Sequence, residues 1–489
     1  PFFPYSSDDG FSIVDYRRVN PQWGSWNDIH ALGERCVLMV DAVINHTSVQ
    51  SIWFQKFLKC EKHYMDYFIY FEKKINLSYV FRPRTTPLLS KFTTDCGEKW
   101  VWTTFSRDQV DLNYKNPDLL IEIIELLLFY IGNGADYIRL DAIAYIWKEL
   151  GTPSIHLPQA HKIIKIFRHI LAVSAPWVKM VSETNVPHEY NTTYFGDYDS
   201  LLGDYDEAQV IYNFSLPPLI MHAIVTGNSS VLNHFVSEKM ETPSENTYFF
   251  NFIASHDGIG VLPASEFLSP KQVQNLAEIT ISNGGKVSYK TNDDGTRSIY
   301  ELNTTLFDFF KNAREKNKEA AEKRFLVSQA VLLSIKGIAG VYIHSLFGSD
   351  NCYQCLKKTN HARSLNRKKF SWQEFQDLIE GVGHDRQYRI FNNMKKIMRL
   401  RLKYSCLGQN GKQKVITAQE EIFIVRRSDD CSTIYCMANL SDAEKELEMD
   451  FGASNMLDII SDKEYNSENG IYKILFDPYQ YIWMKIQIG

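Results

Sequence analysis

Charged and imidazole side chains stand at or just after the ends of four short apolar segments. Such groups are costly at a buried strand end unless they pair with one another or line a cleft. The polar ends are Asp41 to His46, Arg139 to Asp141, Ser182 with Glu183, and Ser255 to Asp257. Each acid taken alone is better explained as a structural ion pair or a cap. Four such ends in succession favour one shared site.

Two of these carboxylates could carry out glycosyl transfer. That reaction needs one carboxylate as nucleophile and one protonated carboxyl that gives its proton to the leaving oxygen. Asp141 stands two residues after Arg139, whose positive charge would keep a neighbouring carboxylate ionised, so we assign Asp141 as the nucleophile. Glu183 is then the general acid and base, kept protonated by burial and by the nearby anions.

The other polar residues suit the binding of sugar hydroxyls. Asp257 could hold the hydroxyls of a sugar that is distorted in the transition state, and His46 and His256 are neutral donors for the same purpose. Asp41 lies deeper in its apolar segment than the other acids, and we give it a structural role.

Bringing these residues together requires parallel strands. Short apolar segments are typical of strands buried on both faces. They cover residues 37–44, 136–143, 178–183, 208–214, 248–254 and 338–343. Helices are predicted between them, over 117–131 with Asn116 as N-cap, over 158–173 and over 319–333. In a barrel the carboxyl ends of all strands open on one face, where the acids would meet.

The alternation of strands and helices predicts an α/β fold with a (β/α)8 TIM barrel, although the pattern alone does not separate a barrel from an open sheet. We expect a catalytic barrel over residues 1–403, with insertions at about 47–103 and 259–317. Short alternating segments then predict a C-terminal β domain over 404–489. Its expected strands are 414–417, 422–426, 433–438, 472–475 and 481–486.

Composition excludes several classes of function. The net charge is -5 and no long basic run is present, which argues against a nucleic-acid partner. The longest apolar stretch, 119–131, is too short for a membrane span and contains two Glu residues. Cys352 and Cys355 form a lone CxxC without a second pair at zinc spacing, so we interpret it as incidental. No metal signature is present, and the scattered cysteines favour a reducing cytoplasm.

Four segments together resemble the α-amylase superfamily of glycoside hydrolases, also called glycoside hydrolase family 13. They are Asp41-Ala-Val-Ile-Asn-His46, Tyr137-Ile-Arg-Leu-Asp141, Ser182-Glu183-Thr and Ala254-Ser-His-Asp257. The set is highly specific, although each segment alone is a weak signal. The resemblance implies the barrel fold, a retaining mechanism and no dependence on bound calcium.

Finer features are similar to the sucrose phosphorylase subfamily. Ser6-Ser-Asp-Asp-Gly-Phe11 resembles the loop in which an Asp, here Asp8, holds the glucose 4-hydroxyl beside Phe11. Arg363-Ser-Leu-Asn-Arg367 resembles a late segment whose final residue, Arg367, joins that contact. Arg82-Pro-Arg84 and Ile299-Tyr-Glu301 resemble the two loops that supply the phosphate-binding residues, here Arg84 and Tyr300.

Within that subfamily, five further segments are most similar to glucosylglycerate phosphorylases. They are 4–11, 101–105, 155–159, 183–188 and 344–349. The resemblance implies that glucosylglycerate and inorganic phosphate, the co-substrate, give α-D-glucose 1-phosphate and D-glycerate without a cofactor. His188 is a possible contact for the glycerate carboxylate, although packing explains it better.

Three hypotheses stay open. A phosphorylase is favoured over an α-glucosidase or transglucosidase, because water needs no anion cradle; its acceptor could equally be glycerol, fructose or fructose 6-phosphate. The third hypothesis is an inactive carbohydrate-binding protein. It arises because the resemblance places Pro1 at the end of the second barrel strand, so the first strand is expected to be missing. The oligomeric state is also open.

Overall fold

A computed structural model covers residues 1–489 and describes all of them except 85, 292–295, 313–318 and 488–489. The chain divides into two compact units. Unit 1 comprises Pro1–Asn185, Glu189–Tyr212 and Lys290–Ser298, and unit 2 comprises Val186–His188, Asn213–Tyr289 and Ile299–Gly489.

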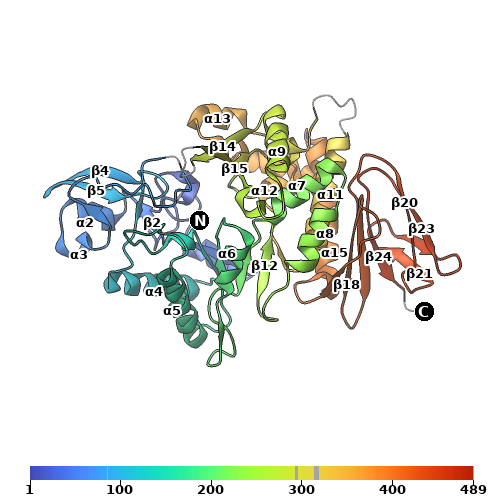
Figure 1. The fold of residues 1–489 in the computed structure, drawn as a ribbon, viewed down its shortest axis with the longest axis horizontal. Coiled ribbons are helices and arrows are strands. Elements are labelled where there is room, and N and C mark those ends of the chain that lie inside the picture. Colours follow the sequence, from blue (N-terminus) through green and yellow to red (C-terminus); the bar gives the residue numbers. More distant parts are fainter. Residues whose placement is uncertain (85, 292–295, 313–318, 488–489) are drawn as a thin grey trace. The chain divides into compact units, whose positions relative to one another are not determined.

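Unit 1 is built on four parallel strands, in the order β1 (Met39–Ala42), β7 (Tyr137–Leu140), β8 (Lys179–Ser182) and β11 (Val210–Tyr212). The N-terminus that Figure 1 marks belongs to this unit. All four lie within predicted apolar segments. Their inner residues are fully buried, among them Ile138, Leu140, Met180 and Val210. Strands this short, covered on both faces, leave the polar residues that follow them at the carboxyl edge of the sheet.

Two predicted helices are present in unit 1, α4 (Pro117–Gly132) and α5 (Pro158–Ser174). Asn116 caps α4, because its Oδ1 accepts from the backbone N–H of Asp118 at 2.9 Å, and Pro117 occupies the first turn. Past the last turn, Gly134 has a φ of 97°, which a glycine adopts without strain. The other α-helices among the described residues of this unit are α1 (Trp26–Gly33), α2 (Ile52–Leu58), α3 (Lys62–Met65) and all but the first residue of α6 (His188–Thr192).

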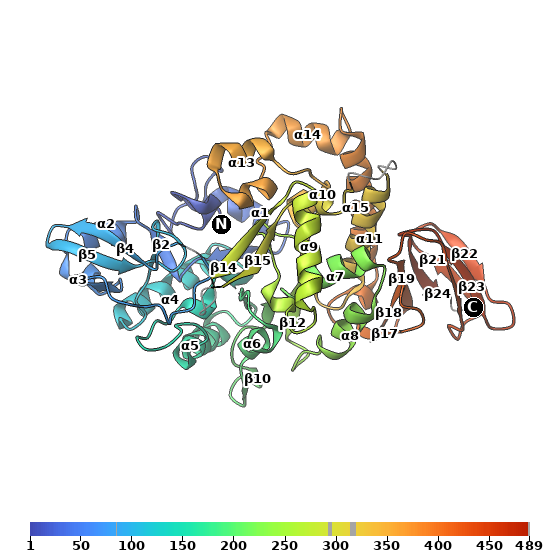
Figure 2. The ribbon, with the colours of Figure 1, turned by 45° about the horizontal axis from the view of Figure 1, so that its top comes forward.

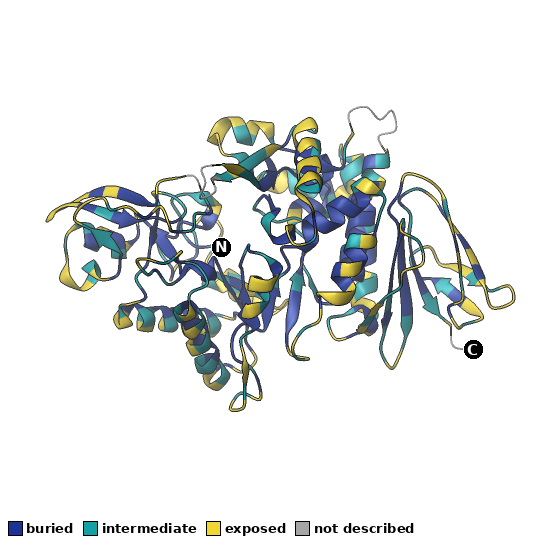
Figure 3. Ribbon diagram, viewed as in Figure 1, coloured by how far each residue is buried: buried dark blue, intermediate teal, exposed yellow. Residues whose placement is uncertain are grey.

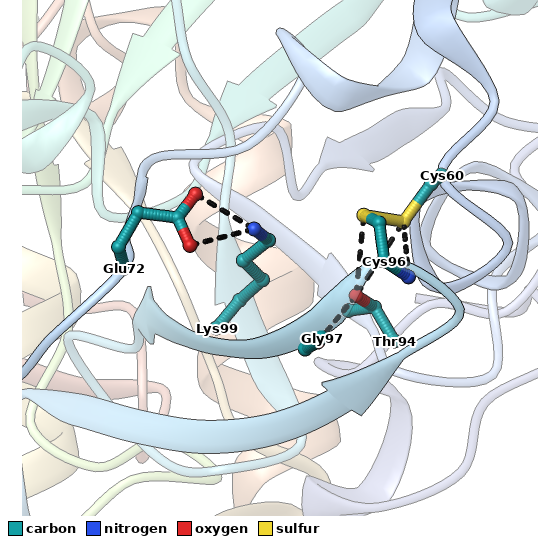
Figure 4. Close-up of a disulfide and its surroundings, with 6 residues drawn as sticks. All are labelled: Cys60, Glu72, Thr94, Cys96, Gly97 and Lys99. Carbon is teal, nitrogen blue, oxygen red and sulfur yellow. Dashed lines mark hydrogen bonds and ion pairs between the residues drawn. A yellow bond between two sulfur atoms is a disulfide. The ribbon is translucent and has the colours of Figure 1, made fainter.

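The predicted insertion at 47–103 folds as a small antiparallel sheet, β3 (Tyr70–Phe71), β5 (Gly97–Trp102) and β4 (Leu89–Thr94). A disulfide joins Cys60, after α2, to Cys96 in the β4–β5 turn (Figure 4). On the same sheet, the buried Lys99 ammonium binds both carboxylate oxygens of Glu72, at 2.6 and 2.8 Å. A second pairing, β2 (His46–Ser48) with β6 (Gln109–Asp111), ties the insertion to the segment that follows β1. Two short strands, β9 (Tyr198–Asp199) and β10 (Asp204–Tyr205), form a hairpin.

Unit 2 contains the parallel pair β12 (Tyr248–Asn251) and β16 (Ile338–Ala339). Helices α7 (Leu216–Thr226) and α11 (Glu319–Ser334) are buried along most of their length, as Figure 3 shows. The predicted strand over 338–343 has only two strand residues. The chain turns at Gly340, whose position leaves no room for a Cβ beside the Phe250 ring, and continues as helix α12 (Ile343–Leu346). The remaining helices are α8 (Ser230–Glu238), α9 (Pro270–Ser282), α10 (Leu306–Phe309), α13 (Tyr353–Thr359), α14 (Trp372–Glu380) and α15 (Asp385–Lys403).

The predicted insertion at 259–317 carries a second small sheet. Strand β13 (Ile259–Gly260) pairs antiparallel with β15 (Arg297–Asn303), which places Gly260 opposite Glu301 and Ile259 opposite Leu302. Strand β14 (Lys286–Thr291) also belongs to this sheet. Residues 292–295 and 313–317 of the predicted insertion lie outside the described residues.

The C-terminal sheet has the strand order β17 (Lys412–Val415), β18 (Ile422–Ser428), β19 (Thr433–Asn439), β24 (Tyr481–Ile486), β21 (Asn455–Asp458) and β22 (Lys463–Asn466) (Figure 2). Strands β20 (Lys445–Met449) and β23 (Tyr472–Phe476) pair with each other. All five predicted strands are present. We missed β20, β21 and β22, because charged residues dominate β20 and β22 and only Leu447 of β20 is buried.

Two arginines, one half-buried and one fully buried, donate to carbonyls at and near the carboxyl end of α11. Arg401 of α15 donates to the carbonyls of Ile335 (3.2 Å) and Gly337 (2.7 Å). Arg427 of β18, which is fully buried, donates to the carbonyls of Ser334 (2.8 Å) and Gly408 (2.6 Å). Positive charge at a helix carboxyl end is favourable, and the donors to Ser334 and Ile335 satisfy carbonyls at or just past the last turn of α11.

Cys352 and Cys355 form a disulfide at the start of α13, so the interpretation of this CxxC as incidental was wrong. The sequence contains no feature that distinguishes a short-range disulfide from two unrelated thiols at this spacing. The backbone N–H of Cys352 also donates to the carbonyl of Leu365 at 2.8 Å, which ties this turn to the segment Ala362–Asn366. Within the described part of the chain, none of the helices combines the length and the apolar character needed to span a membrane.

Candidate active site

Three carboxylates of unit 1 surround one buried guanidinium. Arg139 of β7 donates through Nη1 to Oδ1 of Asp41 (2.7 Å) and to Oδ1 of Asp141 (2.9 Å). Its Nε donates to the Tyr212 hydroxyl at 3.0 Å, and its Nη2 lies 3.9 Å from Oε1 of Glu183. Adjacent parallel strands in register place these side chains together. Asp41, given a structural role above, belongs to this cluster.

Burial and neighbouring charges act on Asp141 in opposite directions. Burial raises the pKa of Asp141, the positive charge of Arg139 and the contribution of His46 lower it, and the negative charge of Asp41 raises it again. Together these effects raise the pKa of Asp141 above its ordinary value. The sequence predicted a carboxylate governed by its cation, whereas in the structure the loss of water outweighs the cation.

The carboxylate of Glu183 contacts the backbone next to Asp141. Its Oε2 accepts from the backbone N–H of Ala142 at 3.0 Å. Ala142 has a φ of 49°, in the left-handed region that residues with a Cβ rarely adopt. Backbone strain of this kind persists only where the surrounding structure fixes it. The turn after β7 therefore sets the spacing between the two carboxyl groups.

His46 is fixed by a buried polar chain in unit 1. Its Nε2 donates to the carbonyl of Phe11 (2.8 Å), so its Nδ1 is free to accept from the Asn45 amide at 3.2 Å. The Asn45 Oδ1 accepts from the Lys148 ammonium at 2.7 Å, and that ammonium also pairs with Asp111 at 2.8 Å. This chain assigns one tautomer to His46.

The Ser6–Phe11 segment forms a strained loop over this region. Asp8 and Asp9 have φ values of 52° and 50°, and Gly10 one of 121°. Oδ2 of Asp8 accepts from the Gln109 amide at 3.3 Å. The Phe11 ring lies 5.7 Å from the guanidinium carbon of Arg139. Unit 1 thus brings together Asp8, Phe11, His46, Arg139, Asp141 and Glu183.

Asp257, His256 and Arg367 lie together in unit 2. The Asp257 carboxylate pairs through Oδ1 with Nη2 of Arg367 (3.2 Å) and with Nη1 of Arg363. Nε2 of His256 lies 3.7 Å from the same oxygen. The backbone carbonyl of His256 accepts from Nε of Arg367 at 2.6 Å.

The two residues expected to bind phosphate belong to different units. Arg84 is half-buried in unit 1, and Tyr300 is buried in β15 of unit 2. Beside Arg84, two buried guanidinium nitrogens of Arg82, Nε and Nη2, find no hydrogen-bond partner among the residues that the structure describes. Sequence reasoning missed Gln109 and Tyr212, because their contacts with Asp8 and Arg139 join residues distant in sequence.

His188 is buried and packs against the Phe249 ring, with its Nε2 hydrogen-bonded to the carbonyl of Lys239 at 2.9 Å. These are the contacts of a side chain packed in the protein interior. Among the described residues, no three His, Cys, Asp or Glu side chains gather in a way that could hold a metal ion.

The family model of the α-amylase catalytic domain matches residues 1–407, and that of the maltogenic amylase C-terminal domain matches residues 415–483. A glucosylglycerate phosphorylase of Spirochaeta thermophila is 44% identical over 91% of this chain and 74% of its own length. One of Escherichia coli is 37% identical over 99% of this chain and 84% of its own.

A solved structure shows the same fold. The crystal structure of sucrose 6F-phosphate phosphorylase from Thermoanaerobacter thermosaccharolyticum superposes with a TM-score of 0.76 at 22% identity, covering 97% of this chain and 90% of that one. With the family match, this likeness confirms the predicted fold class, an α-amylase-type barrel with a C-terminal β domain.

Proposed function

Because this chain belongs to the α-amylase family, we propose that it is a retaining glycoside phosphorylase. Its reaction would convert glucosylglycerate and phosphate into α-D-glucose 1-phosphate and D-glycerate. The observation that carries the mechanism is the pairing of Asp141 and Glu183 around Arg139 and the Ala142 backbone. The choice of substrate is supported by the two relatives named glucosylglycerate phosphorylase.

In the first step, a carboxylate oxygen of Asp141 attacks the anomeric carbon of the glucosyl group. The bond from that carbon to the glyceryl oxygen breaks, and Glu183 gives its proton to this oxygen. Arg139 stabilises the charge of Asp141 before attack and the charge of Glu183 after proton transfer. The result is a covalent glucosyl-enzyme and free glycerate.

In the second step, a phosphate oxygen attacks the anomeric carbon and the bond to Asp141 breaks. Glu183 takes up any proton that the attacking phosphate oxygen carries, and two inversions give net retention. We assign phosphate binding to Arg84 and Tyr300, because a planar guanidinium matches the geometry of phosphate oxygens.

The remaining site residues would hold the glucosyl group. Asp8 and Arg367 would bind its 4-hydroxyl, with Phe11 beside it. Asp257 would bind hydroxyls whose contacts strengthen in the transition state, and His46 and His256 would donate to others. To donate to a hydroxyl, Nε2 of His46 would have to give up or share its hydrogen bond to the carbonyl of Phe11.

Two further assignments are proposals of the same kind. The catalytic domain would span residues 1–403 and the C-terminal β domain 404–489, since helix gives way to strand after α15. We place the protein in the cytoplasm, because phosphorolysis conserves the energy of the glycosidic bond in a sugar phosphate that other enzymes of that compartment can use. The Cys60–Cys96 and Cys352–Cys355 disulfides remove the support that the cysteines were expected to give to a reducing compartment.

The experiment that tests the function is phosphate release from α-D-glucose 1-phosphate. D-glycerate, glycerol, fructose and fructose 6-phosphate are offered separately, with Asp141→Asn as control. Release with D-glycerate alone, lost in the control, is the expected result. Release with another acceptor would change the substrate and keep the mechanism. No release with any acceptor would favour a non-catalytic carbohydrate-binding protein.

A further inference from the structure

Arg363 holds two carboxylates of unit 2 at once. Its Nη2 and Nε donate to Oε1 (2.6 Å) and Oε2 (3.2 Å) of Glu301, and its Nη1 donates to Oδ1 of Asp257. Glu301 is only 1% exposed and Arg363 only 8%. Arg363 lies in the short helical segment Ala362–Asn366, and Glu301 lies in β15. The pair therefore joins elements that are distant in sequence.

The backbone around Asp257 is shaped to admit Glu301. A Cβ at Gly258 would lie 2.4 Å from Cγ of Glu301 and 2.8 Å from Oδ1 of Asn303, so no residue larger than glycine fits there without displacing the Glu301 side chain. The pairing of β13 with β15 sets Gly260 directly opposite Glu301. Glu301 therefore packs against the residue that follows Asp257.

The segment that carries Arg363 also grips the backbone on both sides of Asp257. The Asn366 amide donates to the carbonyls of Ser255 and Asp257, each at 2.9 Å. Arg367 donates to the carbonyl of His256. The main chain of Asp257 is thus held by side chains of Asn366 and Arg367, and its carboxylate by those of Arg363 and Arg367.

The charges of this group balance. Two carboxylates, of Asp257 and Glu301, face two guanidinium groups, of Arg363 and Arg367. Bidentate pairing fixes the plane of the Arg363 guanidinium, and that plane determines where Nη1 points. If Glu301 lost its charge, Arg363 would keep only one partner among these acids, and its guanidinium could rotate towards Asp257.

We propose that Glu301 and Arg363 are positioning residues for Asp257. Their bidentate pair sets the orientation of the carboxylate that binds sugar hydroxyls in the transition state. The proposal rests on the proposed function, which gives Asp257 that role. Because Tyr300 precedes Glu301 in β15, the same strand carries both this pair and a residue assigned to phosphate.

The test measures kcat and KM for fluoride release from α-D-glucosyl fluoride, which requires neither phosphate nor glycerate. Glu301→Gln keeps the size of the side chain and removes its charge. We expect kcat to fall about 10²-fold with little change in KM, since a small misplacement of a catalytic group has this effect. Glu301→Asp, which keeps the charge, should recover part of the loss and remains available if Glu301→Gln does not fold.

A matched control is Asp350→Asn. Asp350 forms another bidentate pair in unit 2, with Nη1 (3.2 Å) and Nη2 (2.7 Å) of Arg386. The Asp350→Asn substitution should lower the midpoint temperature of thermal unfolding without lowering kcat. Arg363→Gln should lower kcat as Glu301→Gln does, and the double variant should lose no more than Arg363→Gln alone, because both act through Asp257.

Several results would overturn the proposal: an unchanged kcat in Glu301→Gln, an equal loss of kcat in Asp350→Asn, or multiplicative losses in the double variant. Fluoride release by the wild type without phosphate release to any acceptor would reject the proposed function and leave this comparison of variants valid. A wild-type protein that releases no fluoride would overturn both.

Discussion

The backbone N–H of Ala142 donates to the carboxylate of Glu183, so the residue that follows Asp141 also holds the second carboxyl group. The left-handed conformation of Ala142 aims that N–H. The carboxyl groups of Asp141 and Glu183 are therefore positioned by one turn.

Glu183→Gln should separate proton donation from nucleophilic attack. The Gln amide oxygen can still accept from Ala142, but the side chain cannot protonate a leaving group. Phosphorolysis of glucosylglycerate should fall by about 10²–10⁴-fold, the usual contribution of a general acid. Fluoride release from α-D-glucosyl fluoride, whose leaving group needs no proton, should fall much less. Equal losses with both substrates would contradict the assignment of Glu183.

Arg139→Gln should move the acid limb of the pH profile. Asp141 must be ionised to attack, so activity is lost as the pH falls through its pKa. Arg139 lowers this pKa, and its removal should shift the limb of kcat/KM to higher pH. Asp41→Asn is a control of opposite sign, because the charge of Asp41 raises the pKa of Asp141 and its loss should shift the limb to lower pH. Limbs that stay in place would reject Asp141 as the titrating group.

Arg84→Gln should weaken phosphate binding selectively. We expect KM for phosphate to rise about 10-fold or more, as for the loss of a charge-assisted contact worth about 1.4 kcal/mol or more. Hydrolytic fluoride release from α-D-glucosyl fluoride, measured without phosphate, should be unchanged. A parallel loss in both assays would show that Arg84 supports the fold and does not bind the anion.

His344 should make the folded state sensitive to acid. Burial lowers the pKa of His344 to about 4, against an ordinary value of 6.5. Between these pH values the unfolded chain takes up a proton that the folded protein does not, so stability falls as the pH drops from 6.5 towards 4. The full shift corresponds to about 3 kcal/mol. His344→Gln should flatten this dependence in urea unfolding at pH 7, 6, 5 and 4, and an unchanged slope would contradict the prediction.

The sequence predicted the parallel strands and the main helices well, because continuous apolar segments and caps such as Asn116 are local signals. It missed β20 and β22, where charged residues mask the strand pattern. Glu301 and Arg363 lie within two segments that the sequence analysis singled out for other residues, Tyr300 and Arg367. Their pairing joins residues far apart in the chain, and no local pattern reports it. The same holds for Asp41 and Tyr212 as partners of Arg139. The Cys352–Cys355 bond is local, but no feature of the sequence distinguishes it from two unrelated thiols.

The position of Arg427 has a consequence for how this protein could be altered by recombination. Its guanidinium reaches from the C-terminal sheet to the last turn of α11, where it donates to the carbonyl of Ser334. Exchange of the C-terminal module for that of another protein would remove this donor to the carbonyl of Ser334. A hybrid would need an arginine at the equivalent place in its second strand, so modular exchange is restricted to donors that carry one.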